Sequence, residues 1–442
     1  MGQHLSVMIV GSGAREHTIS RAYEKSSQAG RIIVAPGNDF IGYDREKEFV
    51  IDKGCSLNYP QSILDIARKY MPDLIDVAQD DALAAGTVDL LQKHGFQVFG
   101  ATRDAAKIEW DKKWSREFMQ RHKIPSPDFR YFDSFEPAAE YVKYLYSDEP
   151  EKLIYVKAAG LCGGKGALKS TSLKEAVENI KRMKSFSDAG EVFLVEEGLQ
   201  GEEFSYYAMC DGQTHHIFKS AQDNKTLLNF DEGDQTGGMG AICPAKITEP
   251  FSDEIEEQFI SRVITGMAAE NIPYKGVLYL GGIVADGRPM NIEYNARWGD
   301  PECQVVLPSL ETDYIDVVTA CIEGRLDEIN IKQDDKARVC VVGASRGYPN
   351  DYSSAKGKRI YGLEDVKDMK EITVFGAGVE VRDGKFYANG GRLFSIVAEG
   401  GNILDARQKA YDAMSHVNIE GNNLHYRTDI GWRDVERYLE EI

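Results

Sequence analysis

In the first hundred residues of the chain, short apolar runs alternate with segments that have the composition of helices. The apolar runs span 7–10, 31–34, 73–77 and 97–99, and the helical segments span 15–29, 61–69 and 82–94. A helix between successive strands returns the chain so that the strands lie parallel, with helices on both faces of the sheet. The alternation therefore predicts an α/β, doubly wound parallel-sheet domain, which we assign to residues 1–110.

The pattern changes after residue 110. A helix over 112–122 stops at Ile-Pro-Ser-Pro, and a strand at 153–157, a helix at 172–185 and a strand at 192–197 follow. Two hairpins are expected around Asp211-Gly212 and Asp286-Gly287, and the polar, glycine-rich residues 221–245 between them are expected to form a long ordered loop. Strands dominate after residue 337, with helices over 403–417 and 433–442. We therefore expect an α+β domain at 111–330 and a smaller, mostly-β domain at 331–442.

The charge and cysteine content exclude several classes of protein. Lysine and arginine number 52 against 71 aspartate and glutamate, a net charge of −19. This acidity argues against nucleic acid or an anionic membrane as the main partner. The seven cysteines are scattered without a C-x-x-C pair, which argues against a disulfide framework or a structural zinc site. With no signal-peptide pattern at the N-terminus and no long apolar run, a cytoplasmic protein is expected.

Two glycine-rich segments follow predicted strands. Gly11–Glu16 lies between a strand and a helix, where helix N-terminal amides can hold a phosphate. A dinucleotide fingerprint would need glycine or alanine where Glu16 stands, and a bare strand-to-helix turn is the alternative. Lys157–Gly166 departs from a P-loop because Gly166 follows Lys165. Its glycines and two lysines still suit a nucleotide phosphate, and a hairpin loop with solvated lysines is the alternative.

The segment from Asn291 to Glu302 carries the most specific pattern. Glu293 and Asn295 are two residues apart on a predicted strand, so both side chains point to one face. Such a pair of oxygen ligands suits Mg²⁺, and Arg297 could bind a phosphate beside the metal. A solvated strand edge would explain the pair but not the Arg-Trp-Gly-Asp-Pro-Glu run that follows. Acidic residues at 196–203 could contact adenine and ribose, or could form a solvated turn.

The order of these motifs resembles the phosphoribosylamine–glycine ligase (glycinamide ribonucleotide synthetase) family, of the ATP-grasp superfamily. The series is GSGAREH, YVKAAGLCGGKG, VEEGLQGEEFS, TGGMGA and NIEYNARWGDPECQVVLP, and the resemblance covers nearly the whole chain. It implies an N-terminal substrate domain, a central ATP-grasp domain with a lid at about 126–200, and a C-terminal domain. It also implies that ATP phosphorylates glycine and that the amine of 5-phosphoribosylamine attacks the acyl phosphate. An ATP-grasp ligase that joins a different amine and carboxylate is the alternative.

The resemblance also assigns roles to individual residues. The ATP site would comprise Lys112, Lys157, Gly163, Gly164, Lys165, Glu196, Glu197, Leu199 and Glu203. Mg²⁺ or Mn²⁺ would bind Glu293 and Asn295. Arg297 would stabilise the transferred phosphoryl group, and Asp223, Lys225 and Asp300 would lie near glycine and the amine. Gly13, Arg15, Asn38, Gly237 and Gly238 would bind the substrates.

Some positions depart from the family pattern. The family usually has Gly-Pro-Glu where this chain has Gln79-Asp80-Asp81, and Gln-Asp-His-Lys-Arg where it has Gln222–Thr226, with Asn224 and Thr226 in place of His and Arg. These departures fall where the small substrates should bind. The sequence does not determine the oligomeric state.

Overall fold

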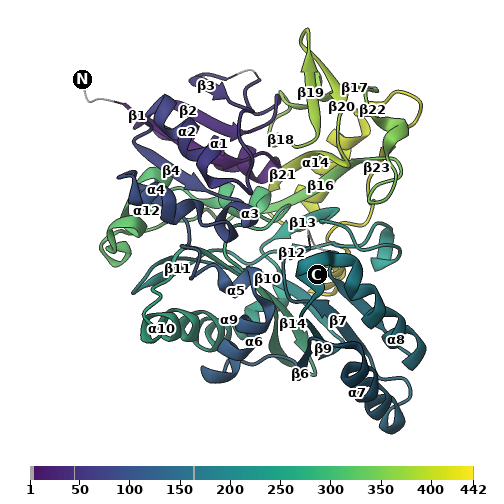
Figure 1. Ribbon diagram of the computed structural model, residues 1–442. Coiled ribbons are helices and arrows are strands. Elements are labelled where there is room, and N and C mark those ends of the chain that lie inside the picture. Colours follow the sequence, from purple (N-terminus) through teal and green to yellow (C-terminus); the bar gives the residue numbers. More distant parts are fainter. Residues whose placement is uncertain (1–3, 44, 163–164, 442) are drawn as a thin grey trace.

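The N-terminal part of the computed structural model is a five-stranded parallel sheet (Figure 1). The structure describes residues 4–43, 45–162 and 165–441. The strand order is β3-β2-β1-β4-β5. The strands are β1 (Leu5–Gly11), β2 (Ala29–Pro36), β3 (Glu48–Ile51), β4 (Leu74–Val77) and β5 (Val98–Phe99). The predicted parallel α/β sheet is therefore confirmed.

Two of the three helices expected in this part differ from the structure. The observed helices are α1 (Ala14–Lys25), α2 (Pro60–Tyr70), α3 (Asp80–Ala84) and α4 (Thr87–Lys93). The predicted helix over 82–94 is wrong as one element, because Gly86 adopts a φ of 83° and breaks it in two. Likewise α1 ends at Lys25 and not at residue 29, because Ala29 already pairs with β1. The break after α3 leaves Asp80 at the first turn of a short helix.

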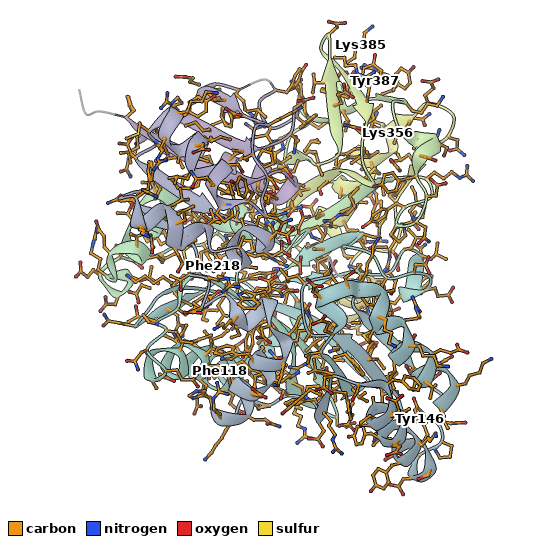
Figure 2. All side chains as sticks on the ribbon, viewed as in Figure 1. Phe118, Tyr146, Phe218, Lys356, Lys385 and Tyr387 are labelled. Atoms are coloured by element: carbon orange, nitrogen blue, oxygen red, sulfur yellow. The ribbon has the colours of Figure 1, made fainter. Side chains whose placement is uncertain are left out.

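Two antiparallel sheets form the central part. One has the order β11-β10-β14-β15 and contains both predicted hairpins, and the other has the order β6-β9-β7-β8. The first comprises β10 (Glu202–Asp211), β11 (His215–Ile217), β14 (Lys275–Ala285) and β15 (Arg288–Asn295). The second comprises β6 (Phe129–Phe132), β7 (Ile154–Ala158), β8 (Ala167–Ser170) and β9 (Phe193–Glu197), with α7 (Phe135–Asp148) and α8 (Leu173–Arg182) packed beside it. This second layer projects at the lower right of Figure 1, and Figure 2 labels Tyr146 there, away from Phe118 and Phe218.

Further helices connect and cover these sheets. Those of the central part are α5 (Lys107–Trp110), α6 (Lys112–Arg121), α9 (Ser252–Ile255), α10 (Arg262–Ala269), α11 (Cys303–Val306) and α12 (Tyr314–Glu323). Those of the C-terminal part are α13 (Leu363–Val366), α14 (Ile403–Ser415) and α15 (Trp432–Glu441). Within the described residues, the model contains no helix of the length and apolar character needed to cross a membrane.

The C-terminal sheet includes strands from the central part of the chain. Its order is β12-β13-β16-β21-β18, and β23 pairs with β16. Its members are β12 (Gln222–Asp223), β13 (Gly240–Cys243), β16 (Ala337–Ser345), β18 (Ile372–Gly376), β21 (Arg392–Gly400) and β23 (Leu424–His425). Residues 221–245 are thus not simply a loop, because β13 pairs with β16 about a hundred residues later. A second small sheet is formed by β19 (Val379–Arg382), β20 (Lys385–Ala388), β17 (Arg359–Tyr361) and β22 (Asn418–Ile419).

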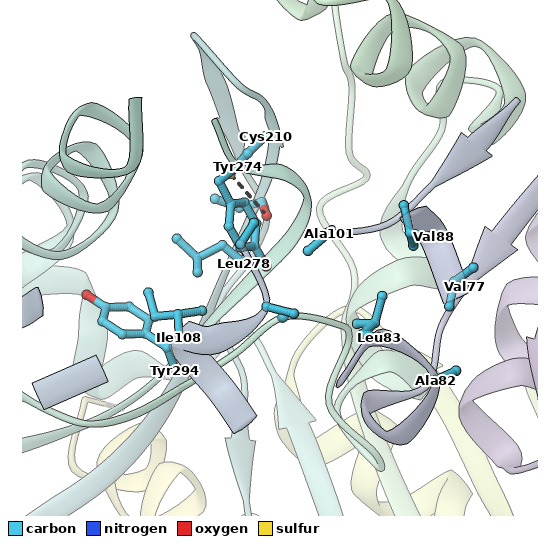
Figure 3. Packing of buried hydrophobic residues seen from close by; sticks show 14 of the residues in the cluster. Val77, Ala82, Leu83, Val88, Ala101, Ile108, Cys210, Tyr274, Leu278 and Tyr294 are labelled. Carbon is cyan, nitrogen blue, oxygen red and sulfur yellow. Dashed lines mark hydrogen bonds between the residues drawn. The ribbon is translucent and has the colours of Figure 1, made fainter. Parts of the chain in front are cut away.

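The N-terminal and central parts share one apolar core. Val77 of the first sheet and Leu83 of α3 belong to the same buried cluster as Leu278 and Tyr294 of β14 and β15 (Figure 3). Burying such side chains stabilises the fold by about 1.5–3 kcal/mol each, because each leaves water on folding. The shared core fixes α3 and α5 against β15, which holds the polar residues discussed below. The boundaries at residues 110 and 330 stay predictions.

Candidate active site

A cavity of about 140 Å³ lies where β7 and β9 face β15, α5 and α6. Six of the residues predicted for ATP, metal or phosphoryl binding line it. They are Lys112, Lys157, Glu196, Glu293, Asn295 and Arg297. These residues come from four elements and the turn after β15, separated by up to 185 positions along the chain. The fold therefore brings five of the eleven predicted ATP and metal residues, together with Arg297, to one place.

Lys157 and Glu196 form a buried ion pair across neighbouring strands of the β7–β9 layer. Arg116, from α6, adds a second ion pair, with Nε 2.8 Å from Glu196 Oε2. Its remaining nitrogens donate to Asn291 Oδ1 at 2.9 Å and to the Ile292 carbonyl at 2.6 Å. Burial opposes ionisation of Glu196, but Arg116 and Lys157 outweigh it and hold the pKa of this carboxyl below its ordinary value. Glu196 is thus a charged anchor for Lys157.

Glu293 lies among the cations of the cavity. Burial opposes its ionisation, yet Lys112, Lys225 and Lys157 hold the pKa of its carboxyl below the ordinary value. A charged carboxylate is the form that a divalent metal binds. Asn295, two residues along β15, is 6% exposed, and its Nδ2 has no hydrogen-bond partner in the described structure. An orphaned amide beside an ionised carboxylate fits a site that a metal and phosphate oxygens would complete.

The described residues hold no group of three or more histidine, cysteine or acidic side chains that could bind a metal alone. This agrees with the chemistry of Mg²⁺, which usually takes one or two carboxylates and completes its shell with water and substrate phosphates. The donor set on β15 therefore fits a metal bound together with a nucleotide.

Arg297 is held by carboxylates from two helices. Its Nη2 lies 2.7 Å from Glu109 Oε1 and 3.9 Å from Asp80 Oδ2, and it donates to Asn295 Oδ1 at 3.0 Å. Its Nε is buried without a partner. Burial raises the pKa of Glu109 to about 7, with Arg297 opposing this shift. The guanidinium is thus oriented by three side chains while one donor remains available to a ligand.

Asp300 joins three parts of the chain. Its carboxylate accepts from Gln304 Nε2 at 2.9 Å and from the Arg15 backbone amide at 3.4 Å, and it lies 3.3 Å from Arg392 Nη1. Arg392 also donates to the Asp300 carbonyl at 2.9 Å. Burial opposes ionisation of Asp300, but Arg392 and Arg15 hold its pKa below the ordinary value. A cation of the C-terminal sheet therefore completes this part of the site.

At the N-terminal turn, the groups predicted to bind substrate have protein partners. The Gly13 amide donates to Glu16 Oε2 at 2.5 Å, and Arg15 Nε donates to Glu16 Oε1 at 2.6 Å. Asn38 Nδ2 donates to the Ser12 and Gly376 carbonyls, at 2.7 and 3.1 Å. Glu16 thus takes the helix N-terminal position that an anion would occupy, and Asn38 braces the turn.

The predicted small-substrate residues meet at the start and end of the segment 223–238. Lys225 Nζ lies 2.7 Å from Glu203 Oε2. Asp223 Oδ1 is buried without a partner, and burial together with Glu302 raises the pKa of this carboxyl well above its ordinary value. Gly238 has a φ of 106°, and a Cβ there would lie 2.9 Å from Asp223 Oδ1. The Gly237 amide donates to the Tyr348 hydroxyl at 2.9 Å.

Four of the remaining ATP predictions, Lys165, Glu197, Leu199 and Glu203, fall outside the cavity lining, and Glu203 pairs with Lys225 instead. Glu197 points to the opposite face of β9 from Glu196, and its Oε1 lies 3.7 Å from Lys152 Nζ. Leu199 follows β9, and Lys165 is exposed on the loop before β8. Gly163 and Gly164 lie outside the described residues. The structure thus brings Glu196, but not the Glu197 carboxylate, to the cavity.

Sequence reasoning missed Glu109, Arg116, Asp80 as an inward-facing acid, and Arg392. Arg116 had a usable signal, because it lies four residues after Lys112 and so shares its helix face. Asp80 follows a strand end, where parallel sheets place ligand-binding groups. Burial opposes ionisation of Asp80, but Arg297 and Arg15 hold its pKa below the ordinary value. The negative charge of Asp80 is therefore neutralised by site cations.

Comparisons with known proteins agree across the whole chain. The sequence matches the N, ATP-grasp (A) and C domains of phosphoribosylglycinamide synthetase over residues 5–109, 110–303 and 338–433. It is 36% identical to phosphoribosylamine–glycine ligase of Caldanaerobacter subterraneus subsp. tengcongensis, covering 96% of this chain and 99% of that one. The Vibrio parahaemolyticus enzyme of the same name is 36% identical over 99% and 100% of the two chains. A crystal structure of phosphoribosylamine–glycine ligase from Thermotoga maritima superposes with a TM-score of 0.80 and 29% identity, over 97% and 100% of the chains.

Proposed function

We propose roles for the site residues of this chain. The chain belongs to the phosphoribosylglycinamide synthetase family and is an ATP-dependent ligase of purine biosynthesis. It joins glycine to 5-phosphoribosylamine with the use of ATP. The observation that supports the roles best is the gathering of Lys112 and Lys157 around the ionised Glu293. Cations around one carboxylate suit a metal–triphosphate complex, whose negative charge they would balance.

In the proposed reaction, an oxygen of the glycine carboxylate attacks the γ-phosphorus of ATP, and the bond to the ADP oxygen breaks. The amine nitrogen then attacks the acyl carbon of glycyl phosphate, loses a proton and expels inorganic phosphate. Arg297, with its free Nε, would stabilise charge on the transferred phosphoryl group. Lys112 and Lys157 would hold the ATP phosphates.

Glu293 and Asn295 would hold Mg²⁺ or Mn²⁺, which supplies neutralising charge to the phosphates when bound. Asp223, Lys225 and Asp300 would bind glycine and the amine. Asp223 lies beside Gly238, the Lys225 carbonyl accepts from Thr236, and Arg392 donates to the carbonyls of both Gly238 and Asp300. Arg15 with Gly13 would contact the phosphoribosyl group, which requires Glu16 to yield the helix N-terminus. The free cysteines support a reducing compartment, and we propose the cytoplasm.

The substrate assignment is tested with purified protein, ATP, Mg²⁺, freshly generated phosphoribosylamine and a panel of amino acids. ADP formation should require the amine and prefer glycine. Formation of ADP without glycine, or preference for a larger amino acid, would contradict the assignment. Hydroxylamine in place of the amine should trap the acyl phosphate as glycine hydroxamate.

The site assignment is tested separately with a matched pair of lysine variants. Lys157→Met removes a buried cation of the cavity, whereas Lys169→Met removes an exposed lysine of the adjacent strand β8. Only Lys157→Met should raise KM for ATP and lower kcat. Equal effects of the two substitutions would contradict the role of Lys157.

A further inference from the structure

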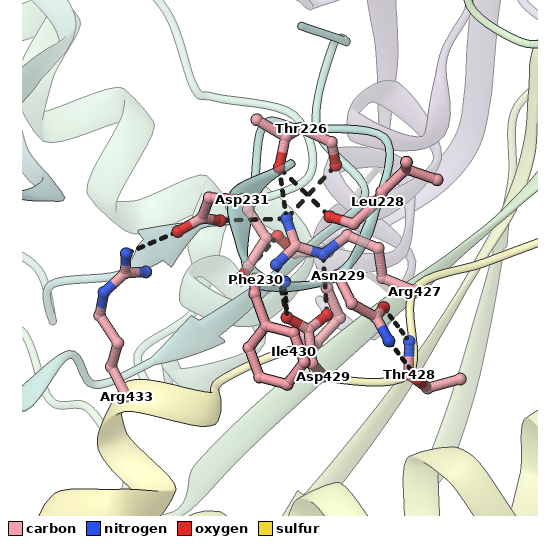
Figure 4. Close-up of polar contacts among 12 residues, drawn as sticks. Thr226, Leu228, Asn229, Phe230, Asp231, Arg427, Thr428, Asp429, Ile430 and Arg433 are labelled. Atoms are coloured by element: carbon pink, nitrogen blue, oxygen red, sulfur yellow. Dashed lines mark hydrogen bonds and ion pairs between the residues drawn. The ribbon is translucent and has the colours of Figure 1, made fainter. Parts of the chain in front are cut away.

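A buried arginine from the C-terminal part of the chain holds the loop that follows Lys225. Arg427 is 1% exposed, and its Nη1 donates to Thr226 Oγ1 at 2.8 Å and to Asp231 Oδ1 at 3.1 Å. Its Nε and Nη2 donate to both carboxylate oxygens of Asp429, at 2.9 and 2.7 Å. Figure 4 shows this guanidinium at the centre of the contacts. Bidentate pairing of this kind fixes orientation as well as distance.

The loop itself has a defined shape. The Leu227 amide donates to the Asp234 carbonyl at 2.9 Å, and the Leu228 amide donates to the Glu232 carbonyl at 3.0 Å, so residues 227–234 form a narrow turn. At its tip Phe230 and Asp231 have φ values of 56° and 60°. This left-handed conformation is unfavourable for a residue with a side chain. The tip therefore needs contacts from outside the loop to keep this shape.

The C-terminal segment supplies those contacts. The Phe230 amide donates to Asp429 Oδ2 at 2.7 Å, and Arg433 Nη2 lies 2.5 Å from Asp231 Oδ2. Asn229 exchanges hydrogen bonds with Thr428, at 2.7 and 3.1 Å. Both strained residues of the tip are thus bonded to residues 427–433, and Asp429 links Arg427 to the tip directly.

The base of the same loop lies at the proposed small-substrate site. The Thr236 amide and hydroxyl both donate to the Lys225 carbonyl at 2.8 Å, which closes the loop. The Gly238 amide then donates to Thr236 Oγ1 at 3.0 Å. Thr226 directly follows Lys225 in the chain. A displacement of Thr226 would therefore move Lys225 and, through the closing hydrogen bonds, Gly238.

We propose that Arg427 is a positioning residue for the small-substrate half of the ligation reaction. By holding Thr226 and the strained tip, it sets Lys225 and the backbone at Gly237 and Gly238 in the geometry that binds glycine and the amine. This inference rests on the proposed function, because that proposal places Lys225, Gly237 and Gly238 at the small substrates. Its effect should fall on those substrates and not on ATP.

The test compares steady-state kinetics of Arg427→Lys and Arg427→Met with those of Arg407→Met in the full-length protein. Arg407 holds the same C-terminal segment through the carbonyls of Thr428 and Ile430, at 2.8 and 3.0 Å. We expect Arg427→Lys to raise KM for glycine or the amine at least about tenfold, while KM for ATP stays within about twofold. Arg407→Met should change neither. Guanidinium ion at millimolar concentration should partly restore kcat/KM of Arg427→Met but not of Arg407→Met.

A parallel rise in the KM values for ATP, glycine and the amine would overturn the proposal, because a merely structural role changes all three together. No rise in any of the three KM values would overturn it as well. If Arg427→Met fails to fold, Asp231→Ala removes the contacts of the tip to both Arg427 and Arg433 and should give the same selective rise. Lys225→Gln separates the two proposals. Unchanged glycine and amine KM values in Lys225→Gln would refute the proposed role of Lys225. A large effect in Lys225→Gln with none in Arg427→Lys would refute only the role of Arg427.

Discussion

Replacement of Glu109 by glutamine should impair the phosphoryl-transfer step with little change in structure. The substitution keeps the size of the side chain and the oxygen that accepts from the Ala296 amide at 2.8 Å. It removes the charge 2.7 Å from Arg297 Nη2. Asp80, at 3.9 Å, is too far for a hydrogen bond and cannot take over the orientation of the guanidinium.

The size of the effect follows from the lost contact. A hydrogen bond to a charged group contributes about 1.5–3 kcal/mol, and if it acts through the orientation of Arg297 this corresponds to a fall in kcat of roughly 10- to 150-fold. The pH dependence gives a second signature. Because burial raises the pKa of Glu109 to about 7, the carboxylate pairs with Arg297 only above that pH. Wild-type kcat should therefore fall as pH drops through about 7, and Glu109→Gln should lack this decline.

The assay is ADP release at saturating ATP, glycine and amine, measured from about pH 6 to about pH 9. Glu117→Gln is the control, because Glu117 lies on the neighbouring helix α6 and its carboxylate is 3.8 Å from Lys113 in a half-exposed pair. A Glu109→Gln enzyme with kcat within twofold of wild type, or with the acidic decline intact, would refute the reasoning.

Further predictions concern the metal, the loop before β8 and a buried acid. Glu293→Gln should abolish ADP formation while the circular dichroism spectrum is unchanged. A metal chelator should stop ADP formation by the wild type until Mg²⁺ is restored. A near-normal kcat of Glu293→Gln at modest Mg²⁺ would contradict the metal site. Proteolysis after Lys165 should slow when an ATP analogue and Mg²⁺ are added, and equal cleavage would count against a lid. Asp76 accepts from the Tyr23 hydroxyl at 2.9 Å, and burial raises its pKa to about 7. The folded state therefore binds the extra proton, and stability falls as pH rises from about 4 to about 7. Relative to wild type, the free energy of unfolding of Asp76→Asn, measured in urea, should increase by up to about 4 kcal/mol as the pH rises over that range. A difference between the two proteins that does not depend on pH would exclude the protonation of Asp76 as its cause.

The sequence predicted the site best where neighbouring residues determine it. Glu293, Asn295 and Arg297 lie on one strand and the turn after it, so their spacing alone places them together. Lys112 and Lys157 start a helix and end a strand, and both reach the cavity as expected. The family resemblance added roles to these residues, and the comparisons confirm the family and the reaction.

Predictions were weaker where a partner lies far along the chain. Arg116 and Lys157 engage Glu196, which the resemblance placed at adenine, and Arg392 and Asp300 meet across 92 positions. Residues 221–245 show no alternation of apolar and polar residues, yet β13 becomes a strand because β16 offers its hydrogen-bonding edge. The single helix expected over 82–94 was divided at Gly86, whose left-handed φ the helical pattern does not reveal.

The sequence by itself determined the parallel N-terminal sheet, the two hairpins of the central part and the placement of Glu293 and Asn295 on one strand, because each depends on periodicity or spacing within a few residues. Only the tertiary structure decided which charges neutralise one another. Asp80 faces Arg297 and Arg15, and Arg427 reaches Thr226 from the other end of the chain. The physical reason is that electrostatic energy depends on distance and burial, and neither is encoded by separation along the sequence.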